Sequence, residues 1–567
     1  RQSPVALRGA EETDAKEATR EEKKQAAAMN QLARTESEQS RRKTFAFLTV
    51  DAHGHINAML AIADQLRARG HRTVFILNDG RVPAHYGHQV ISVARKQATE
   101  VEPGERSTSA GGAQWGEEGV FLGDKVLNSK WERMVDLLDL DVTKEEFRVK
   151  SLTHNLSLLK LTIELEIIAH DSRVEEILVE LKPDLALVDQ LSPFPAVRRL
   201  ARQEYARKLG LERPLQWTTV VSCNPLPVYH AHFAGQLPPP FMGLPMSLGR
   251  NELEVEQLRY ERALRDSGIL ATYLKLAQMS GELAQRAEAM NLEEERKFRL
   301  FVANESPHFN IYQFPRQLDY APNFNLPEHW LRVDSLMRAP LAPELAKRDE
   351  RLLQQVAAWR LQAPSATIIY ASLGTTMGCN LKLVGNLLGQ LFRCLELEAG
   401  WRFVVALGSR SHQIAEGQQA ELQRWRLAGR VLSAGWWPQP ELFKRGLLDA
   451  CISHGGNNTI AELFLAARLR GRANPPRLLL VPAFHDQLDN ARRVADLGLG
   501  VSLPASELLA AGERDLLLLL ALRRALQPNG AAAATGGSCF GAERAAELRD
   551  SHYCARLIET KLAQLAG

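Results

Sequence analysis

Apolar residues form a first series of short strands and helices in the N-terminal half of the chain. A continuous apolar run covers 44–50, apolar side chains recur at helical spacing from Ile56 to Leu66, and a second run covers 71–77. A strand, a helix and a strand at this spacing predict a βαβ unit in a parallel sheet. A later run at 185–188 follows a proline and predicts another strand, which ends at Asp189.

A second series of the same kind begins near residue 366. Apolar runs at 366–371, 401–407 and 478–484 alternate with turns and helical patterns. Two half-molecules built of βα units predict an α/β fold with two facing Rossmann-like domains and a cleft between them. Ligands in such open sheets bind at the carboxyl ends of the strands.

The stretch 436–490 contains the clearest candidate for a ligand site. An apolar strand at 450–453 passes through His454, Gly455 and Gly456 into a helix with apolar residues at helical spacing. At such a helix start, unpaired backbone N–H groups and the positive end of the helix dipole point outward together. The pattern therefore predicts a site for a phosphate group.

The same stretch resembles the donor-binding signature of the UDP-glycosyltransferases, the inverting family-1 enzymes with the GT-B fold. The positions that carry the resemblance are Trp436, Pro438, Gln439, His454, Gly456, Asn458, Thr459, Glu462, Asp486 and Gln487. Their spacing matches the signature without a gap as far as Glu462. The distance from Glu462 to Asp486 is longer than in the plant form, and the excess around 468–476 has the composition of a polar surface loop.

The resemblance implies a role for each position. Trp436 would stack on uracil, Gln439 would bind the nucleobase or ribose edge, and Glu462 would accept hydrogen bonds from the ribose. Asp486 and Gln487 would bind the sugar hydroxyls, and glutamine there suits glucose in plant relatives. The residues expected around the diphosphate come from two turns: Ser372, Gly374, Thr375, His454, Gly456, Asn458 and Thr459. Such a site needs no metal ion, because the helix dipole and hydrogen bonds compensate the charge of the leaving group.

His55 is the candidate catalytic base. It lies after the first strand in a loop, DAHGHIN, that resembles the GHxxP stretch of the same family, with Ala58 where proline is usual. A histidine near its ordinary pKa can take the proton of an attacking hydroxyl. The resemblance implies that Asp189 orients this histidine and stabilises its imidazolium form. His53 is the nearby competitor for the role.

Two alternatives remain open on the sequence alone. The loop also resembles the strand-then-HxH entry of metal-dependent amidohydrolases, in which His53 and His55 would be metal ligands. The second alternative is a catalytically silent protein that keeps the UDP-sugar site. It would apply if the insertion at 468–476 disturbs the approach of Asp486 to the sugar.

The domain organisation follows from these patterns. We expect a charged, disordered extension at 1–42, an N-terminal acceptor-binding domain at 43–335 and a linker at 336–355. A C-terminal UDP-sugar-binding domain is expected at 356–545. A helix at 546–567 is expected to cross back to the N-terminal domain, as in many GT-B proteins.

The amino-acid composition argues against some classes of binding partner. The 567 residues contain 70 Lys and Arg against 67 Asp and Glu, a net charge of +3 without a basic block, which argues against nucleic acid. The six cysteines are scattered and predict free thiols in a reducing compartment. No stretch has the length of a signal peptide core or a membrane span, so we expect a cytoplasmic protein without a membrane partner.

The acceptor is expected to be an apolar small molecule such as a flavonoid, a phenolic or a xenobiotic. Residues 217–250 are rich in proline, aromatic residues and methionine, which suits an apolar pocket. The candidate pocket residues are Phe194, Phe233, Phe241, Met242 and Met246. The sequence thus predicts an inverting, metal-independent transferase that uses a UDP-sugar, with glucose as the expected sugar, and no cofactor.

Overall fold

The computed structural model describes most of both halves of the chain. The described residues are 42–50, 53–77, 88–93, 144–233, 235–281, 304–321, 323–338, 343–378, 380–408, 411–472, 475–512, 515–527 and 549–566. The expected extension at 1–42 lies almost entirely outside them.

The N-terminal half contains a parallel sheet of seven strands in the order β3-β2-β1-β4-β5-β6-β7. Chain order reverses between β1 and β4, which pair directly, with Leu48 opposite Val188. The strands are β1 (Thr44–Leu48), β2 (Arg72–Leu77), β3 (Gln89–Ser92), β4 (Leu185–Asp189), β5 (Trp217–Val221), β6 (Asn310–Gln313) and β7 (Trp330–Val333).

Helices cover both faces of this sheet because strand side chains alternate between two apolar clusters. Phe45 and Phe47 of β1 pack on the side of α2 and α22, whereas Ala46 and Leu48 pack on the side of α4, α5, α6 and α10. The helical elements of this half are α2 (His53–Ala68), α4 (Lys144–Thr162), the π-helix η3 (Ile163–Ile167), the 3-10 helix η4 (Ile168–His170), α5 (Asp171–Leu181), α6 (Pro195–Leu200), α7 (Gln203–Lys208), α8 (Leu226–His232), α9 (Arg250–Asp266) and α10 (Ile269–Met279).

The C-terminal half contains a second parallel sheet, of six strands in the order β10-β9-β8-β11-β12-β13. Here the chain order reverses between β8 and β11, where Ser372 lies opposite Ser453. The strands are β8 (Thr367–Ser372), β9 (Trp401–Ala406), β10 (Val431–Ala434), β11 (Ala450–Ser453), β12 (Arg477–Leu480) and β13 (Gly500–Ser502).

Helices also cover the second sheet on both faces, with α14, α19 and α20 on one side and α12, α16 and α17 on the other. The helical elements are α12 (Pro343–Gln362), α13 (Gly374–Met377), α14 (Leu381–Leu397), the 3-10 helix η6 (Ser411–Gln413), α15 (Glu416–Leu427), α16 (Gln439–Arg445), α17 (Asn457–Leu469), α18 (Asp486–Asp496), α19 (Ala505–Ala510), α20 (Leu517–Leu526) and α22 (Ser551–Ala566). The predicted α/β class with two Rossmann-like halves is confirmed.

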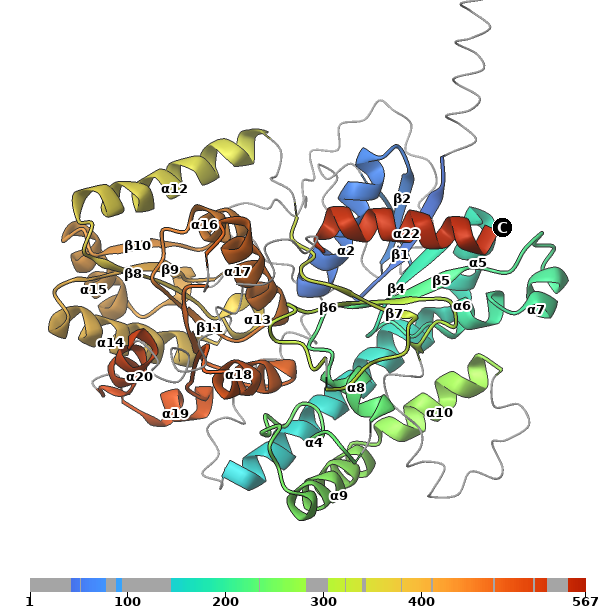
Figure 1. Cartoon of the computed structure of the whole chain (residues 1–567), viewed down its shortest axis with the longest axis horizontal. Coiled ribbons are helices and arrows are strands. Elements are labelled where there is room, and N and C mark those ends of the chain that lie inside the picture. The colour runs from blue at the N-terminus through green and yellow to red at the C-terminus, as the bar shows by residue number, and fades with distance from the viewer. Residues whose placement is uncertain are drawn as a thin grey trace, which may run out of the picture.

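The C-terminal helix α22 lies on the N-terminal half, across α2 (Figure 1). Cys554, Ile558 and Leu562 of α22 are buried in the same apolar cluster as α2. Arg69, which follows α2, donates to the Glu559 carboxylate over 2.7 Å. The C-terminal helix therefore packs on the N-terminal half, next to α2.

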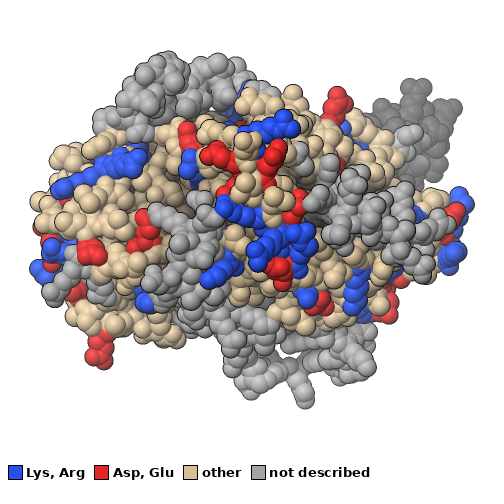
Figure 2. All heavy atoms as spheres, turned by 90° about the horizontal axis from the view of Figure 1, so that it is seen from below, with Lys and Arg blue, Asp and Glu red and all other residues tan. Residues whose placement is uncertain are grey.

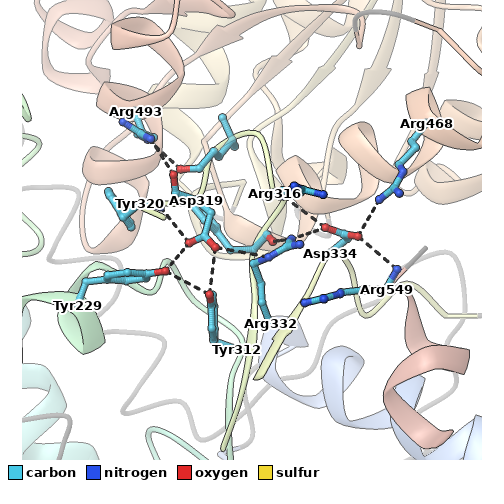
Figure 3. Close-up of polar contacts among 12 residues, drawn as sticks. Tyr229, Tyr312, Arg316, Asp319, Tyr320, Arg332, Asp334, Arg468, Arg493 and Arg549 are labelled. Carbon is cyan, nitrogen blue, oxygen red and sulfur yellow. Dashed lines mark hydrogen bonds and ion pairs between the residues drawn. The ribbon is translucent and has the colours of Figure 1, made fainter. Parts of the chain in front are cut away.

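The buried carboxylate of Asp334 ties the two halves together (Figure 3). Asp334, after β7, accepts hydrogen bonds from Arg468 of α17 over 3.0 Å and from the backbone N–H of Arg549 over 3.3 Å. It also pairs with Arg332. One side chain therefore connects β7, α17 and the entry to α22.

Asp319 lies at the centre of a second group of hydrogen bonds, near the start of the loop between β6 and β7. Its carboxylate accepts from the hydroxyls of Tyr229 over 2.9 Å and Tyr312 over 3.0 Å. Arg493 of α18 donates to the backbone carbonyls of Leu318 and Asp319, both over 2.8 Å (Figure 3). The start of the loop between β6 and β7 is thereby held against the C-terminal half.

The range 336–355, which the sequence analysis assigned to a linker, contains most of helix α12. Leu353, Val356 and Trp359 recur at helical spacing and are buried against the second sheet. Short strand β7 was also missed, since its burial pattern alternates only weakly.

No described helix is long and apolar enough to cross a membrane. Acidic and basic side chains lie intermixed on the face shown in Figure 2. The described cysteines, Cys223, Cys394, Cys451 and Cys554, are free and buried.

Candidate functional site

The candidate site residues gather at the two positions where strand order reverses. His55 follows β1 and Asp189 ends β4, and these two strands are neighbours. Ser372 ends β8 and His454 follows β11, again neighbours. The carboxyl ends of strands diverge at such points and leave room for ligands in open α/β sheets. Topology therefore brings together residues that are far apart in sequence.

His55 lies in the first turn of α2 and is hydrogen-bonded through one ring nitrogen to Asp189. The distance from Nδ1 of His55 to Oδ2 of Asp189 is 2.8 Å, and the hydroxyl of Ser222 is 3.1 Å from the same nitrogen. The other ring nitrogen, Nε2, is 3.7 Å from Sγ of Cys223. Asp189 also accepts from the backbone N–H of Leu191 over 2.8 Å, which fixes its carboxylate. The side chain of His53 lies outside the described residues.

The Asp189 carboxylate sets the charge of His55. Burial by itself would lower the pKa of His55, but the negative charge of Asp189 and a smaller effect of Cys223 outweigh it. The net result is a pKa well above the usual range of histidine. An imidazolium is thus stabilised at this position, as a base that has accepted a proton requires.

The ring of His454 lies close to two glycines of the predicted diphosphate site, Gly374 and Gly456. A Cβ atom at Gly374 would be 2.5 Å from Cε1 of His454, and one at Gly456 would be 2.3 Å from its Nε2. Gly374 also has a φ of +72°, which other residues rarely adopt. Nδ1 of His454 is buried without a hydrogen-bond partner, and burial lowers the pKa of the ring to about 4. A neutral imidazole with a free nitrogen is left at the start of α17, where a buried polar atom needs a partner.

The remaining members of the predicted diphosphate site lie beside this turn. Ser372 accepts from the backbone N–H of Gly374 over 3.2 Å, so its hydroxyl is part of the turn. Gly456 is the residue before α17 and Asn458 and Thr459 lie in its first turn. The backbone of Thr375 is in α13, and its side chain lies outside the described residues.

The predicted nucleoside residues form a connected group. Nε2 of Gln439 donates to Glu462 over 2.7 Å and to Thr459 over 3.1 Å, and Tyr370 donates to Oε1 of Gln439 over 3.2 Å. Burial raises the pKa of Glu462 to about 7, against the effect of the Gln439 hydrogen bond. Trp436 is 43% exposed.

The two adjacent tryptophans have opposite environments. Trp437 is 1% exposed and donates from Nε1 to the Val405 carbonyl over 3.0 Å. The exposure of Trp436 leaves part of its surface accessible, as stacking on a base requires.

Three of the residues predicted to contact the donor form hydrogen bonds with other protein groups in this structure, either across the two halves or within one half. Asn458 donates to the Gly54 carbonyl over 2.8 Å and accepts from Gln313 over 2.9 Å. Asp486 accepts from the backbone N–H of Asn224 over 3.0 Å, while Gln487 accepts from that of Ala483 over 3.1 Å. Asn458 and Asp486 therefore join the C-terminal half directly to the loops around His55.

Sequence reasoning missed the residues that complete this contact. Asp489 accepts from the backbone N–H groups of Phe241 over 2.6 Å and Gly243 over 2.9 Å, and burial raises its pKa to about 7. Asn490 accepts from Asn224 over 2.7 Å and donates to the Gly455 carbonyl over 2.9 Å. The only signal in the sequence was the polar run after the apolar strand at 478–484, in which four of six residues make such contacts.

The insertion at 468–476 lies at the far end of the unit formed by β11, α17 and β12. It starts where α17 ends, about 20 Å along the helix axis from Asn457. Arg470 donates to the Lys444 carbonyl over 2.8 Å and Arg472 to that of Gly446 over 3.1 Å. Residues 469–472 of the loop are exposed and lie at the opposite end of α17 from the turn at Gly456.

The candidate acceptor residues are mainly packed in the interior. Phe194 and Met242 are 4% and 1% exposed in the core of the N-terminal half, and Phe233 and Met246 are partly buried. Phe241 has a φ of 67° and stacks on His485, with ring centroids 4.3 Å apart. Of this set, Phe241 therefore lies at the contact between the halves.

Comparisons with known proteins support the same family. No protein-family model matches the chain. The chain is 28% identical over 195 residues to mouse UDP-glucuronosyltransferase 1A6, which covers 30% of this chain and 35% of that protein. It is 30% identical over 125 residues to mouse UDP-glucuronosyltransferase 1A9, covering 19% of this chain and 22% of that protein. The matched segment is thus about a third or less of the length of these relatives.

A solved structure extends the likeness to nearly the whole chain. The glycotransferase of kitacinnamycin aligns over 92% of this chain and 99% of its own, with a TM-score of 0.50 and 16% identity. At this identity the likeness concerns the fold, which is GT-B: two parallel Rossmann-like sheets with helices on both faces.

Proposed function

We propose that this chain, a member of the UDP-glycosyltransferase family, moves a sugar from a UDP-sugar to an apolar small-molecule acceptor with inversion at the sugar carbon. The observation that supports the proposal most is that the candidate base and the candidate phosphate site lie next to each other. His55 is hydrogen-bonded to Asp189, and the residue before it, Gly54, accepts from Asn458 at the start of the candidate phosphate helix. A base and a diphosphate site so close together suit direct transfer between acceptor and donor.

His55 acts as the general base in this proposal. With Nδ1–H donated to Asp189, Nε2 takes the proton of the acceptor hydroxyl as its oxygen attacks the anomeric carbon. The bond from that carbon to the diphosphate oxygen breaks at the same time. One displacement gives the glycoside, UDP and an imidazolium that Asp189 stabilises, and the proton then passes to solvent.

The C-terminal half holds the leaving UDP. The groups that would bind its diphosphate are the backbone N–H groups at the start of α17 and Nδ1 of His454, which is buried without a partner. With His454 neutral, a proton on Nδ1 would donate to a phosphate oxygen. These groups supply the stabilisation of negative charge without a metal ion.

The nucleoside and the sugar follow the roles that the family signature implies. Trp436 stacks on uracil, Gln439 binds its edge or the ribose, and Glu462 binds the ribose hydroxyls. Asp486 and Gln487 bind the sugar, where their present contacts to backbone N–H groups fix them in place. Glucose is the sugar expected, and UDP-glucuronic acid is the other donor to test, since the matched relatives are named for it.

The acceptor binds in the N-terminal half on the Nε2 side of His55. Asn224, Phe241 and Gly243 form contacts between the halves, and Asn224 directly follows Cys223, which lies 3.7 Å from Nε2 of His55. Closing the halves around the substrates would exclude water, which would otherwise compete as acceptor. Phenolic and flavonoid hydroxyls fit this arrangement.

A catalytically silent UDP-sugar-binding protein is the second candidate, because three predicted donor contacts are engaged between protein groups in this structure. A metal-dependent amidohydrolase has less support, since the two-sheet fold matches that of glycosyltransferases.

Product analysis separates these candidates. We would incubate the chain with UDP-glucose or UDP-glucuronic acid and a mixed panel of phenolic, flavonoid and xenobiotic acceptors, and detect conjugates by mass spectrometry. The proposal predicts a hexose conjugate with inverted anomeric configuration, and a Trp436→Ala variant with at least about tenfold weaker UDP binding. Leu427→Ala, at a residue 80% exposed and outside the site, is the matched control. UDP binding without any conjugate would favour the silent protein, and no UDP binding would refute the donor site.

A further inference from the structure

A cysteine, a histidine and an aspartate from the two halves converge beside His55. One potential ligand atom from each of Cys223, His485 and Asp486 lies within 4.8 Å of the other two. Cys223 follows β5 of the N-terminal half, whereas Asp486 is the first residue of α18 in the C-terminal half and His485 directly precedes it. Within the described ranges, this is the one such group of three.

The separations approach those of a tetrahedral metal centre. Zn²⁺ binds thiolate, imidazole and carboxylate at 2.0–2.3 Å, which sets the ligand atoms about 3.3–3.8 Å apart. Nε2 of His55 is already 3.7 Å from Sγ of Cys223, and Nδ1 of His485 is 3.7 Å from Oδ1 of Asp486. Small side-chain movements would bring Cys223, His485 and Asp486 onto one ion. His55 is outside that group of three, but its contact with Cys223 makes it the neighbour that could move in as a fourth ligand.

The two ligands from α18 are held in position before any ion binds. His485 has a φ of 56°, which is rare for a residue other than glycine, and its ring stacks on Phe241 with centroids 4.3 Å apart. Asp486 is fixed through Oδ2 by the backbone N–H of Asn224, which leaves Oδ1 toward His485. Ligands restrained by neighbouring groups in this way lose less freedom on binding.

We propose that Cys223, His485 and Asp486, with His55 as the fourth ligand, bind Zn²⁺ at the contact between the halves and that this ion inhibits the protein. The ion joins α2 and the end of β5 to α18, so it bridges the two halves. The ion would also be coordinated by Nε2 of His55 and by the Asp486 carboxylate, so neither group could act on a substrate. Acceptor deprotonation and sugar binding would both be blocked, so the metal is an inhibitor and no cofactor of the reaction.

Metal binding is tested without any substrate. The full chain would be titrated with Co²⁺, and Zn²⁺ affinity would be measured by competition with a chromophoric chelator. We expect one ion per chain, d–d bands of tetrahedral intensity and a thiolate-to-cobalt charge-transfer band. Cys223→Ser should abolish the charge-transfer band, and His485→Gln should weaken Zn²⁺ binding at least about tenfold.

A matched histidine control is available at His412, which is exposed on η6 and distant in sequence from the cluster. His412→Gln should leave the spectrum and the affinity unchanged. If Cys223→Ser fails to fold, His485→Gln still decides the question. A wild-type spectrum without the charge-transfer band, or equal affinity in wild type and His485→Gln, would overturn the site.

Inhibition is tested separately and rests on the proposed transferase function. Zn²⁺ should stop UDP release from UDP-glucose and a chelator should restore it, and His485→Gln should need at least about tenfold more Zn²⁺ for the same inhibition. Zn²⁺ binding without loss of transfer would overturn the inhibitory role. Because binding is measured without substrates, a failure of the proposed function leaves the metal site open to its own test.

Discussion

At the scale of single residues, the sequence was informative where chemistry is local. His55 could be selected from its loop and Asp189 from the strand that precedes it, and the structure places their side chains 2.8 Å apart. Ser222 and Cys223 also contact the His55 ring, but they are 167 and 168 residues away in sequence. No local pattern marks such partners, because only the packing of neighbouring strands brings them together.

The His55–Asp189 pair predicts a change in pH dependence. A base with a raised pKa is protonated at low pH, so kcat/KM should rise with pH until His55 loses its proton. Asp189→Asn removes the charge that raises this pKa. The acid limb of the kcat/KM profile should therefore move to lower pH, while kcat falls by about 10²–10⁴-fold because the imidazolium is no longer stabilised.

UDP affinity, measured by calorimetry, is the control for Asp189→Asn and should not change. An acid limb that stays at the wild-type position would mean that Asp189 does not set the charge of His55.

At the scale of elements, the donor turn was the easiest part to predict. Its strand, glycines and helix are contiguous, so the period of the apolar residues and the turn chemistry point to one structure. Helix α12 was missed because its place depends on distant contacts: Leu353 and Val356 are buried on the second sheet, which no local pattern shows.

Gly374 provides a test of this turn. In Gly374→Ala the new methyl group would lie 2.5 Å from the His454 ring, in a backbone with φ +72°. Overpacking and strain should lower the free energy of unfolding by about 1–3 kcal/mol and displace His454 from the phosphate site. UDP binding should weaken at least about tenfold, as measured by calorimetry, if His454 donates one hydrogen bond to the diphosphate.

Gly417→Ala is the matched control, because nothing lies within 4 Å of its added Cβ and the residue is helical. It should keep UDP affinity and leave stability unchanged or raise it by up to about 1 kcal/mol. Equal UDP affinity in Gly374→Ala and wild type would argue against His454 as a donor to the diphosphate.

At the scale of the whole molecule, the two halves could be predicted but their contact could not. Each half follows from its own alternation of strands and helices. The bonds from Asn224 to Asp486 and from Gly54 to Asn458 span 262 and 404 residues. Such pairs carry no periodic signal, so the polar residues of α18 were assigned to the sugar alone.

The Asp334 network predicts how strongly the halves are coupled. Asp334→Ala removes a buried carboxylate that accepts from the partly buried Arg468 guanidinium and from the Arg549 N–H. Loss of one partner of a buried ion pair should lower the free energy of unfolding by about 3–5 kcal/mol in urea. Glu254→Ala, which breaks an exposed pair with Arg250, should change it by less than about 0.5 kcal/mol. Similar losses in both variants would mean that Asp334 does not couple the halves.

In the proposed reaction, His55 removes the acceptor proton while the C-terminal half holds UDP. The most direct measurement is acceptor-dependent UDP release from UDP-glucose by wild type and by His55→Ala, with UDP affinity determined for both. We expect His55→Ala to bind UDP as wild type does but to release it about 10²–10⁴-fold more slowly. Release by His55→Ala at the wild-type rate would refute the role of His55 as the base.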